Sequence, residues 1–207
     1  MNNDELKNLI DELRALPRET ECVEFKVNND APDDIGEYIS ALANSACLLD
    51  QPFGYLVFGV ENGTHTVVGT VFRPRDAKVG NEEIENWLAR LLDPRIDFGI
   101  HECDYNGLHV VVLKIDPAHH IPVKFKGDAY VRIGSYKKRL KDYPEKERKI
   151  WRKKEKEDWS KGICEGATLD DLDPVAVARS RVNYKQKNPA RAAEVDTWDD
   201  ATFLNKA

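Results

Sequence analysis

Apolar residues recur at helical spacing in three stretches of the chain. The first stretch runs from residue 4 to residue 16, and its apolar face carries Leu6, Leu9, Ile10, Leu13 and Leu16. The second face carries Ile35, Tyr38, Ile39, Leu42 and Ala43, and the third carries Ile84, Trp87, Leu88, Leu91 and Leu92. This period predicts three amphipathic helices. Asp34 and Glu37 have the spacing of a capping box for the second helix, and Asn81 is the expected cap of the third.

Other stretches have the pattern of strands. Residues 53–60 form an almost wholly apolar run, as expected for a central strand that is covered on both faces. Asn106-Gly107 lies between the strand-like stretches 98–105 and 108–115 and predicts a hairpin. We also expect a short strand at 22–27 and a second hairpin, 123–126 with 129–133, around Gly127-Asp128. These elements predict an α+β fold, with a mixed sheet of about six strands and packed helices.

The character of the sequence changes after Tyr143-Pro144. Lys and Glu interleave over residues 145–159, which predicts a charged helix, and a glycine-containing joint follows. A further helix is expected within residues 168–187, and another element begins at Trp198. We therefore expect a folded domain over residues 1–142, a charged helix over 143–161, and a linker with a helical tail over 162–207.

Composition limits the functional classes. With 207 residues and 41% hydrophobic content, the chain can bury one good core plus appendages. No apolar run approaches membrane length and no signal-peptide pattern opens the chain, so we expect a cytoplasmic protein without a membrane partner. The four cysteines contain no CxxC pair, which argues against zinc, so that a metal would be held by carboxylates. Neither a phosphate-loop motif nor GxGxxG occurs, so no ATP site is expected in this portion.

Charge is segregated along the chain. The net charge is −6, yet residues 121–161 contain 15 Lys/Arg and 7 Asp/Glu, or +8, which leaves −14 for the remainder. Such segregation predicts a localised phosphate-binding surface. The expected contacts are Arg132, Ser135, Lys137, Lys138, Arg139 and Lys141. The alternative is a solvated helix whose Glu and Lys side chains pair with one another.

Two tyrosines flank the expected phosphate contacts. Tyr130 and Tyr136 could stack on bases, although core packing explains Tyr130 equally well. Cations with neighbouring aromatic rings favour single strands or structured RNA as the ligand.

A second group of charged residues lies near the start of the chain. Glu19, Glu24 and Lys26 place two carboxylates and an ammonium group within eight residues. In a strand Glu24 and Lys26 point to the same face, because they are two residues apart. Such a group can hold a divalent cation and stabilise a phosphate, or it can be an ion pair at an edge strand. The residues alone leave both interpretations open.

Five segments in order resemble the Schlafen AlbA-like domain. They are Glu19 with Val23-Glu24-Phe25-Lys26, Ala41-Leu42-Ala43-Asn44, the glycine-led strand 54–60, Val68-Gly69, and the closing segments 122–125 and 130–135. The resemblance covers about residues 19–135. It implies a module that binds DNA or RNA, within a transcriptional regulator. It also implies that the chain is the N-terminal part of a longer bacterial or archaeal protein with an ATP-binding region.

The resemblance also implies a catalytic site. RNA-cutting relatives use two glutamates and an aspartate, which implies catalytic roles for Glu19, Glu24 and Lys26, and a Mg²⁺ or Mn²⁺ site at Glu19, Glu24 and Asn62. This chain has Asn62 where the family has aspartate, and an amide offers an oxygen without a charge. We therefore rank nucleic-acid binding first and a metal-dependent endoribonuclease second. A protein-interaction or oligomerisation module, for instance a homodimer, is third.

Overall fold

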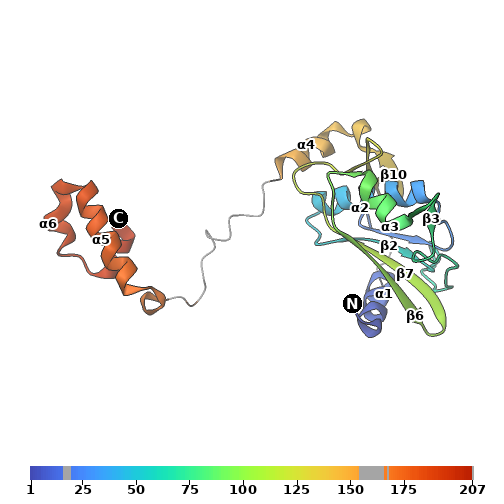
Figure 1. Ribbon diagram of the computed structural model, residues 1–207, viewed down its shortest axis with the longest axis horizontal. Helices are drawn as coiled ribbons and strands as arrows, with labels where there is room; N and C mark the ends of the chain where they lie inside the picture. The colour runs from blue at the N-terminus through green and yellow to red at the C-terminus, as the bar shows by residue number, and fades with distance from the viewer. Residues whose placement is uncertain (16–19, 154–165, 167, 207) are drawn as a thin grey trace. The chain divides into compact units, whose positions relative to one another are not determined.

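The computed structural model describes residues 1–15, 20–153, 166 and 168–206 (Figure 1). The chain forms two compact units, residues 1–155 and residues 156–207. None of the helices described is long and apolar enough to span a membrane.

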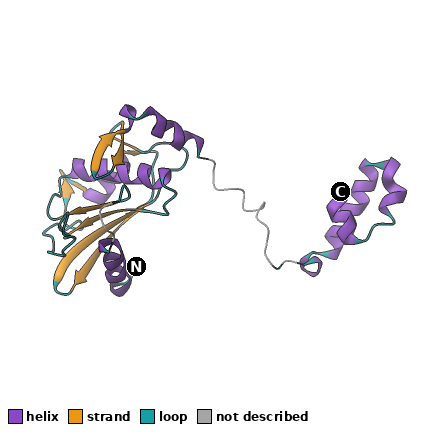
Figure 2. Cartoon of the chain, turned by 180° about the vertical axis from the view of Figure 1, so that it is seen from behind, coloured by secondary structure: helices purple, strands orange, loops and turns teal. Residues whose placement is uncertain are grey.

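A mixed four-stranded sheet forms the centre of the first unit (Figure 2). Its strands lie in the order β1 (Val23–Lys26), β2 (Gly54–Phe58), β7 (Leu108–Ile115) and β6 (Phe98–Tyr105). β1 and β2 are parallel, and the other neighbours are antiparallel. The β6–β7 hairpin has the predicted bounds, because Asn106 and Gly107 adopt φ of 53° and 84°, as a two-residue turn of this kind requires.

Helices cover both faces of this sheet. α1 (Asn3–Arg14) packs through Leu6, Ile10 and Leu13 on the face that holds Phe25 and Val57. α2 (Pro32–Leu48) covers the opposite face, which holds Leu56 and Phe58. Since side chains alternate along a strand, Phe25 points towards α1, whereas Glu24 and Lys26 point towards α2. The charged pair of β1 therefore faces the larger core rather than solvent.

A second four-stranded sheet is antiparallel. Its strands lie in the order β10 (Tyr136–Arg139), β9 (Asp128–Ile133), β8 (Lys124–Phe125) and β5 (Leu92–Asp93). The β8–β9 hairpin was predicted, but its turn is one residue earlier. Lys126 and Gly127 take the positive φ values, and Asp128 already belongs to β9. The lysine run at 137–139 forms strand β10, which the sequence pattern did not indicate.

The predicted α+β class is confirmed, although the described strands are divided among separate sheets. β3 (Lys78–Val79) and β4 (Glu82–Glu83) form a further two-stranded sheet. β4 runs directly into α3 (Ile84–Leu91), whose N-cap is Glu83, so the prediction of Asn81 as the cap was wrong. The capping box at Asp34 and Glu37 was also wrong. α2 begins three residues earlier, with Ala31 at the cap position and Pro32, whose fixed φ suits the first helical turn, as its first residue.

The 3₁₀ turn η1 (Leu140–Asp142) connects β10 to α4 (Pro144–Arg152). α4 belongs to the first unit, because Ile150 is fully buried in its core. Lys153 caps α4, which therefore ends earlier than predicted. The predicted charged helix from residue 154 onward, and the joint except for Gly166, lie outside the described residues.

The second unit is helical, as predicted for the tail. Its described elements are η3 (Leu169–Asp171), α5 (Pro174–Lys187), η4 (Pro189–Arg191), α6 (Ala192–Val195) and α7 (Asp200–Lys206). Val177, Val195, Trp198 and Phe203 form its apolar core, with the Tyr184 ring packed against them. The tail is thus a folded unit with a core of its own.

Candidate nucleic-acid interface

Polar side chains of α2 fix the position of β9. The Asn44 amide nitrogen donates to the carbonyl oxygens of Val123 and Tyr130, at 2.9 and 2.8 Å. Its oxygen accepts the Val123 N–H at 2.8 Å. The hydroxyl oxygen of the next residue, Ser45, accepts the Arg132 N–H at 2.9 Å. These buried side chains supply partners for backbone groups that would otherwise lack them, and they hold β9 against the helix.

This position of β9 directs Arg132 into the protein. Its side chain is 0% exposed, and the guanidinium group forms an ion pair with Oε2 of Glu24. Lys26 Nζ lies 2.7 Å from the other oxygen of the same carboxylate, and it donates to the Tyr38 hydroxyl at 3.1 Å. Buried charges require such partners, because isolated charges are costly to desolvate. Arg132, expected as a phosphate contact, therefore lies inside the protein, bonded to Glu24.

Lys137 extends the same network towards the surface. Its ammonium group forms ion pairs with Asp34 and, at 2.6 Å, with Glu37. The Tyr38 ring centroid lies 4.3 Å from this ammonium group. Tyr130 donates its hydroxyl proton to Glu37 at 3.0 Å, and burial, together with this bond, raises the pKa of Tyr130 to about 12. We name the six charged residues the ionic network. Its members are Glu24, Lys26, Asp34, Glu37, Arg132 and Lys137.

The sequence did not reveal the roles of Asp34, Glu37 and Tyr38 in this network. Their spacing of three and four residues puts them on one face of α2, and that spacing was the available signal. The sequence did not give the pairing of β9 with β10, which places Lys137 opposite Arg132.

The predicted metal ligands do not form a metal site in the described part of the chain. Both oxygens of Glu24 are engaged by Lys26 and Arg132. Asn62 is exposed in the turn after β2, and Glu19 lies outside the described residues. No group of three His, Cys, Asp or Glu side chains that could hold a metal occurs among the residues described. A carboxylate already neutralised by two cations is a poor ligand for Mg²⁺ or Mn²⁺, which bind anionic oxygens. Glu24, as its two cationic partners hold it, therefore does not fit the expected ion.

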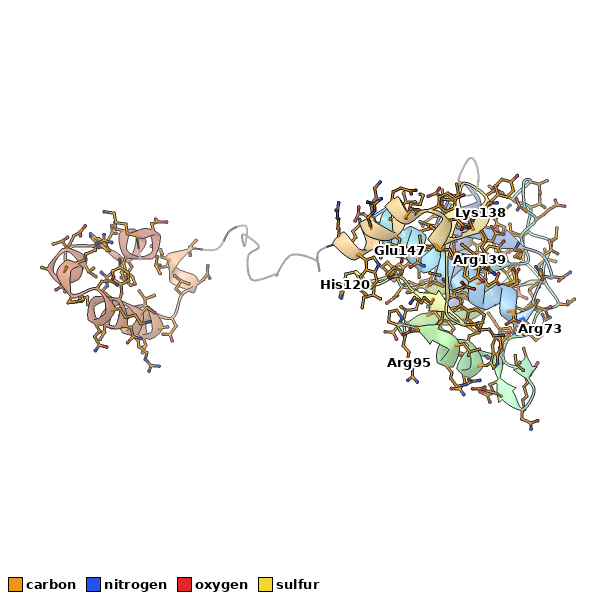
Figure 3. The ribbon with its side chains drawn as sticks, turned by 90° about the horizontal axis from the view of Figure 1, so that it is seen from above. Arg73, Arg95, His120, Lys138, Arg139 and Glu147 are labelled. Atoms are coloured by element: carbon orange, nitrogen blue, oxygen red, sulfur yellow. The ribbon has the colours of Figure 1, made fainter. Side chains whose placement is uncertain are left out.

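The remaining expected contacts are exposed. Ser135 lies in the turn before β10, and Lys138, Arg139 and Lys141 are all exposed on β10 and η1. Figure 3 shows Lys138 and Arg139 close together on the first unit. Arg139 has a distant ion pair, 3.8 Å from Asp128. Within the described residues, Lys138 and Lys141 form no ion pair, unlike Lys137.

α4 adds further exposed cations. Arg148, Lys149 and Arg152 are exposed, and no described carboxylate pairs with any of them. Mutual pairing of Glu and Lys along this helix was the alternative interpretation, and the described part of α4 does not show it. We name the exposed cations of β10, η1 and α4 that have no carboxylate partner among the described residues the cationic segment. Its members are Lys138, Lys141, Arg148, Lys149 and Arg152.

The family model described as Schlafen, AlbA_2 matches residues 19–141. The chain belongs to the Schlafen AlbA_2 family. Membership indicates a nucleic-acid-binding module and confirms the resemblance carried by the five segments. A second model, a domain of unknown function named DUF8451, matches residues 148–207 of this Schlafen AlbA_2 chain.

Several solved structures are similar to the chain, and two of them are described here. One is the N-terminal domain of a RecG-related protein from Nitrosomonas europaea, with 25% identity and a TM-score of 0.42, covering 66% of this chain and 92% of that one. The other is the DIP2311 protein from Corynebacterium diphtheriae, with 18% identity and a TM-score of 0.40. That match covers 95% of this chain but 35% of the other protein. No curated protein matches.

Proposed function

We propose that this Schlafen AlbA_2 chain binds DNA or RNA by docking phosphates on the cationic segment. The observation that carries the proposal is the division of the basic residues into two groups. Arg132 and Lys137 are neutralised by carboxylates, whereas the cationic segment is exposed and has no carboxylate partner among the described residues. Exposed cations of this kind exchange counterions for phosphates, which is the main source of affinity in nucleic-acid binding.

The ionic network gives β10 its orientation. Successive side chains of a strand point to opposite faces, so the bonds of Lys137 to α2 direct Lys138 away from α2. Arg132 and Lys137 then act as positioning residues, and the phosphate contacts come from Lys138 and from the residues that follow it. In its narrower form the proposal makes the chain the nucleic-acid-binding part of a transcriptional regulator. That role requires preference for one DNA sequence.

The test measures binding of labelled tRNA, single-stranded DNA and duplex DNA across a range of salt concentrations. The double reversal Lys138→Glu/Lys141→Glu should weaken binding at least about tenfold at low salt and lower the salt slope by about 2, one for each lost phosphate contact. Arg95→Glu, which reverses one charge where the double variant reverses two, is the control, and the losses are compared per reversed charge. Arg95 is exposed and lies away from Lys138 and Arg139 in Figure 3. Its affinity should change less than that of the double variant.

Equal losses in the double variant and in Arg95→Glu would refute the cationic segment as the binding surface.

The same incubations in Mn²⁺ and in EDTA address cleavage. Metal-dependent cutting that disappears in Glu24→Gln would contradict the argument that the Glu24 site does not fit a metal. Sedimentation of the protein alone, in the same buffers, tests whether it forms a homodimer.

A further inference from the structure

The most exposed aromatic rings lie in the same part of the chain as the cationic segment. Among the described aromatic residues, only Tyr136 and Trp151 are strongly exposed, at 69% and 53%. The other described Phe, Tyr and Trp rings are buried or half-buried. Tyr136 precedes Lys138 on β10, and Trp151 lies on α4 between Arg148 and Arg152. Exposing a large ring costs favourable burial, so two such rings among exposed cations indicate a surface for a flat, anionic ligand.

Tyr136 is presented together with a cation. It is the first residue of β10, directly after the turn at Gly134 and Ser135. The Lys138 ammonium group lies 5.6 Å from the centroid of its ring, on the same side of the strand. A nucleotide has the matching pair of groups, because its base can stack on the ring while its phosphate meets the ammonium group.

Trp151 lies on α4, close in sequence to other exposed cations. Ile150 is fully buried and anchors the helix, which leaves the neighbouring Trp151 ring at the surface. Arg148 is three residues before Trp151, so the two side chains lie on the same face of the helix. Tyr130, the other tyrosine that could have stacked on a base, is half-buried and donates its hydroxyl proton to Glu37. Tyr130 is therefore a structural residue.

We infer, resting on the proposed function, that the ligand is single-stranded nucleic acid whose bases stack on Tyr136 and Trp151. A duplex offers the same phosphates, but its bases are stacked on one another and their faces are unavailable. Exposed rings add affinity only where bases are free, in a single strand or a loop. DNA and RNA share this chemistry, and separate probes distinguish them.

The test compares the full chain with Tyr136→Leu and Tyr136→Phe. Fluorescence anisotropy would measure their affinities for labelled single-stranded RNA, single-stranded DNA and a DNA duplex of about 20 nucleotides, enough to span a stacking site. Tyr136→Leu should weaken binding of at least one single strand by about 5- to 150-fold, which corresponds to the loss of one base–aromatic stack. Duplex affinity should change less than about twofold, because the cations are intact. Tyr136→Phe keeps the ring and should bind like the unsubstituted chain.

Trp151→Leu should give the same selective loss. Unchanged single-strand affinity in both leucine variants, or an equal loss for duplex and single strand, would overturn the inference while salt-sensitive binding still supports the proposed function. A change in sedimentation without a change in affinity would assign the rings to a protein interface and also overturn it. Absence of salt-sensitive binding to every probe would instead overturn the proposed function itself.

Discussion

Removal of the Arg132 guanidinium group should destabilise the first unit strongly. The substitution Arg132→Met keeps a long side chain but removes its charge, so the Glu24 carboxylate loses one of its two cationic partners. The Glu24 side chain is only 3% exposed, so water cannot take the place of the lost partner. Loss of one member of a buried ion pair costs about 3–5 kcal/mol. Lys26 continues to neutralise the carboxylate, so we expect about 3 kcal/mol.

Arg139→Met is the matched control, since Arg139 lies on the adjacent strand of the same hairpin. Its side chain is 51% exposed and lies 3.8 Å from Asp128, which is itself 43% exposed. Exposed pairs of this kind contribute about 0–1 kcal/mol. The structure therefore predicts a difference of about 2 kcal/mol or more between two Arg→Met substitutions on paired strands.

Native-state hydrogen exchange of peptides from β2 and β7, followed by mass spectrometry, reports the first unit apart from the second. A loss of about 3 kcal/mol should accelerate exchange about a hundredfold in Arg132→Met. Equal exchange in Arg132→Met and Arg139→Met would refute the assignment of Arg132 to a structural ion pair.

Two further predictions concern other buried groups. Asn44→Ala should cost about 2–4 kcal/mol, because it leaves two backbone groups buried without a partner, and exposed Ser135→Ala should cost less than about 0.5 kcal/mol. Denaturant unfolding measures both, and similar midpoints would contradict the structural role of Asn44. Burial raises the pKa of Cys22 to about 11 from 9.0, so alkylation at pH 8 should be about 100-fold slower than in the unfolded chain. The fold therefore favours the neutral Cys22 thiol over the thiolate. The stability that comes from this preference is complete below pH 9 and is lost between about pH 9 and 11. Rapid alkylation of the native protein would refute the burial of the Cys22 thiol.

The sequence predicted local elements well where turn chemistry determines them. Asn106-Gly107 gave the bounds of the β6–β7 hairpin correctly, because two positive φ values leave little freedom in register. The start of α2 was misplaced, because Pro32 begins the helix without a side-chain cap. Asp34 and Glu37 have the residue types and the spacing of a capping box, yet both form ion pairs with Lys137. Lys137 lies about 100 residues further along the chain, so a tertiary contact determines the role of these two carboxylates.

The same limit explains the candidate site. Within the sequence, Arg132, Lys137 and Lys138 are three equivalent cations in one basic stretch. The carboxylates that pair with Arg132 and Lys137 belong to β1 and α2, which are distant in sequence. Only the tertiary structure therefore distinguishes a buried cation from an exposed one. Alternation along β10 then decides the outcome residue by residue. Lys137 is held by α2, and Lys138 is available to a phosphate because it is the next residue of the strand.

The ionic network also limits what the family resemblance can transfer to this chain. The position of Glu24 in the family motif implied that it binds a metal. In the structure its carboxylate instead forms ion pairs with Arg132 and Lys26. Binding a divalent cation there would place further positive charge beside two cations, at a cost that the neutral side chain of Asn62 does nothing to offset. Phosphate binding on the cationic segment requires no such rearrangement. The contacts of Glu24 therefore support the proposed binding of nucleic acid more than the alternative of its cleavage.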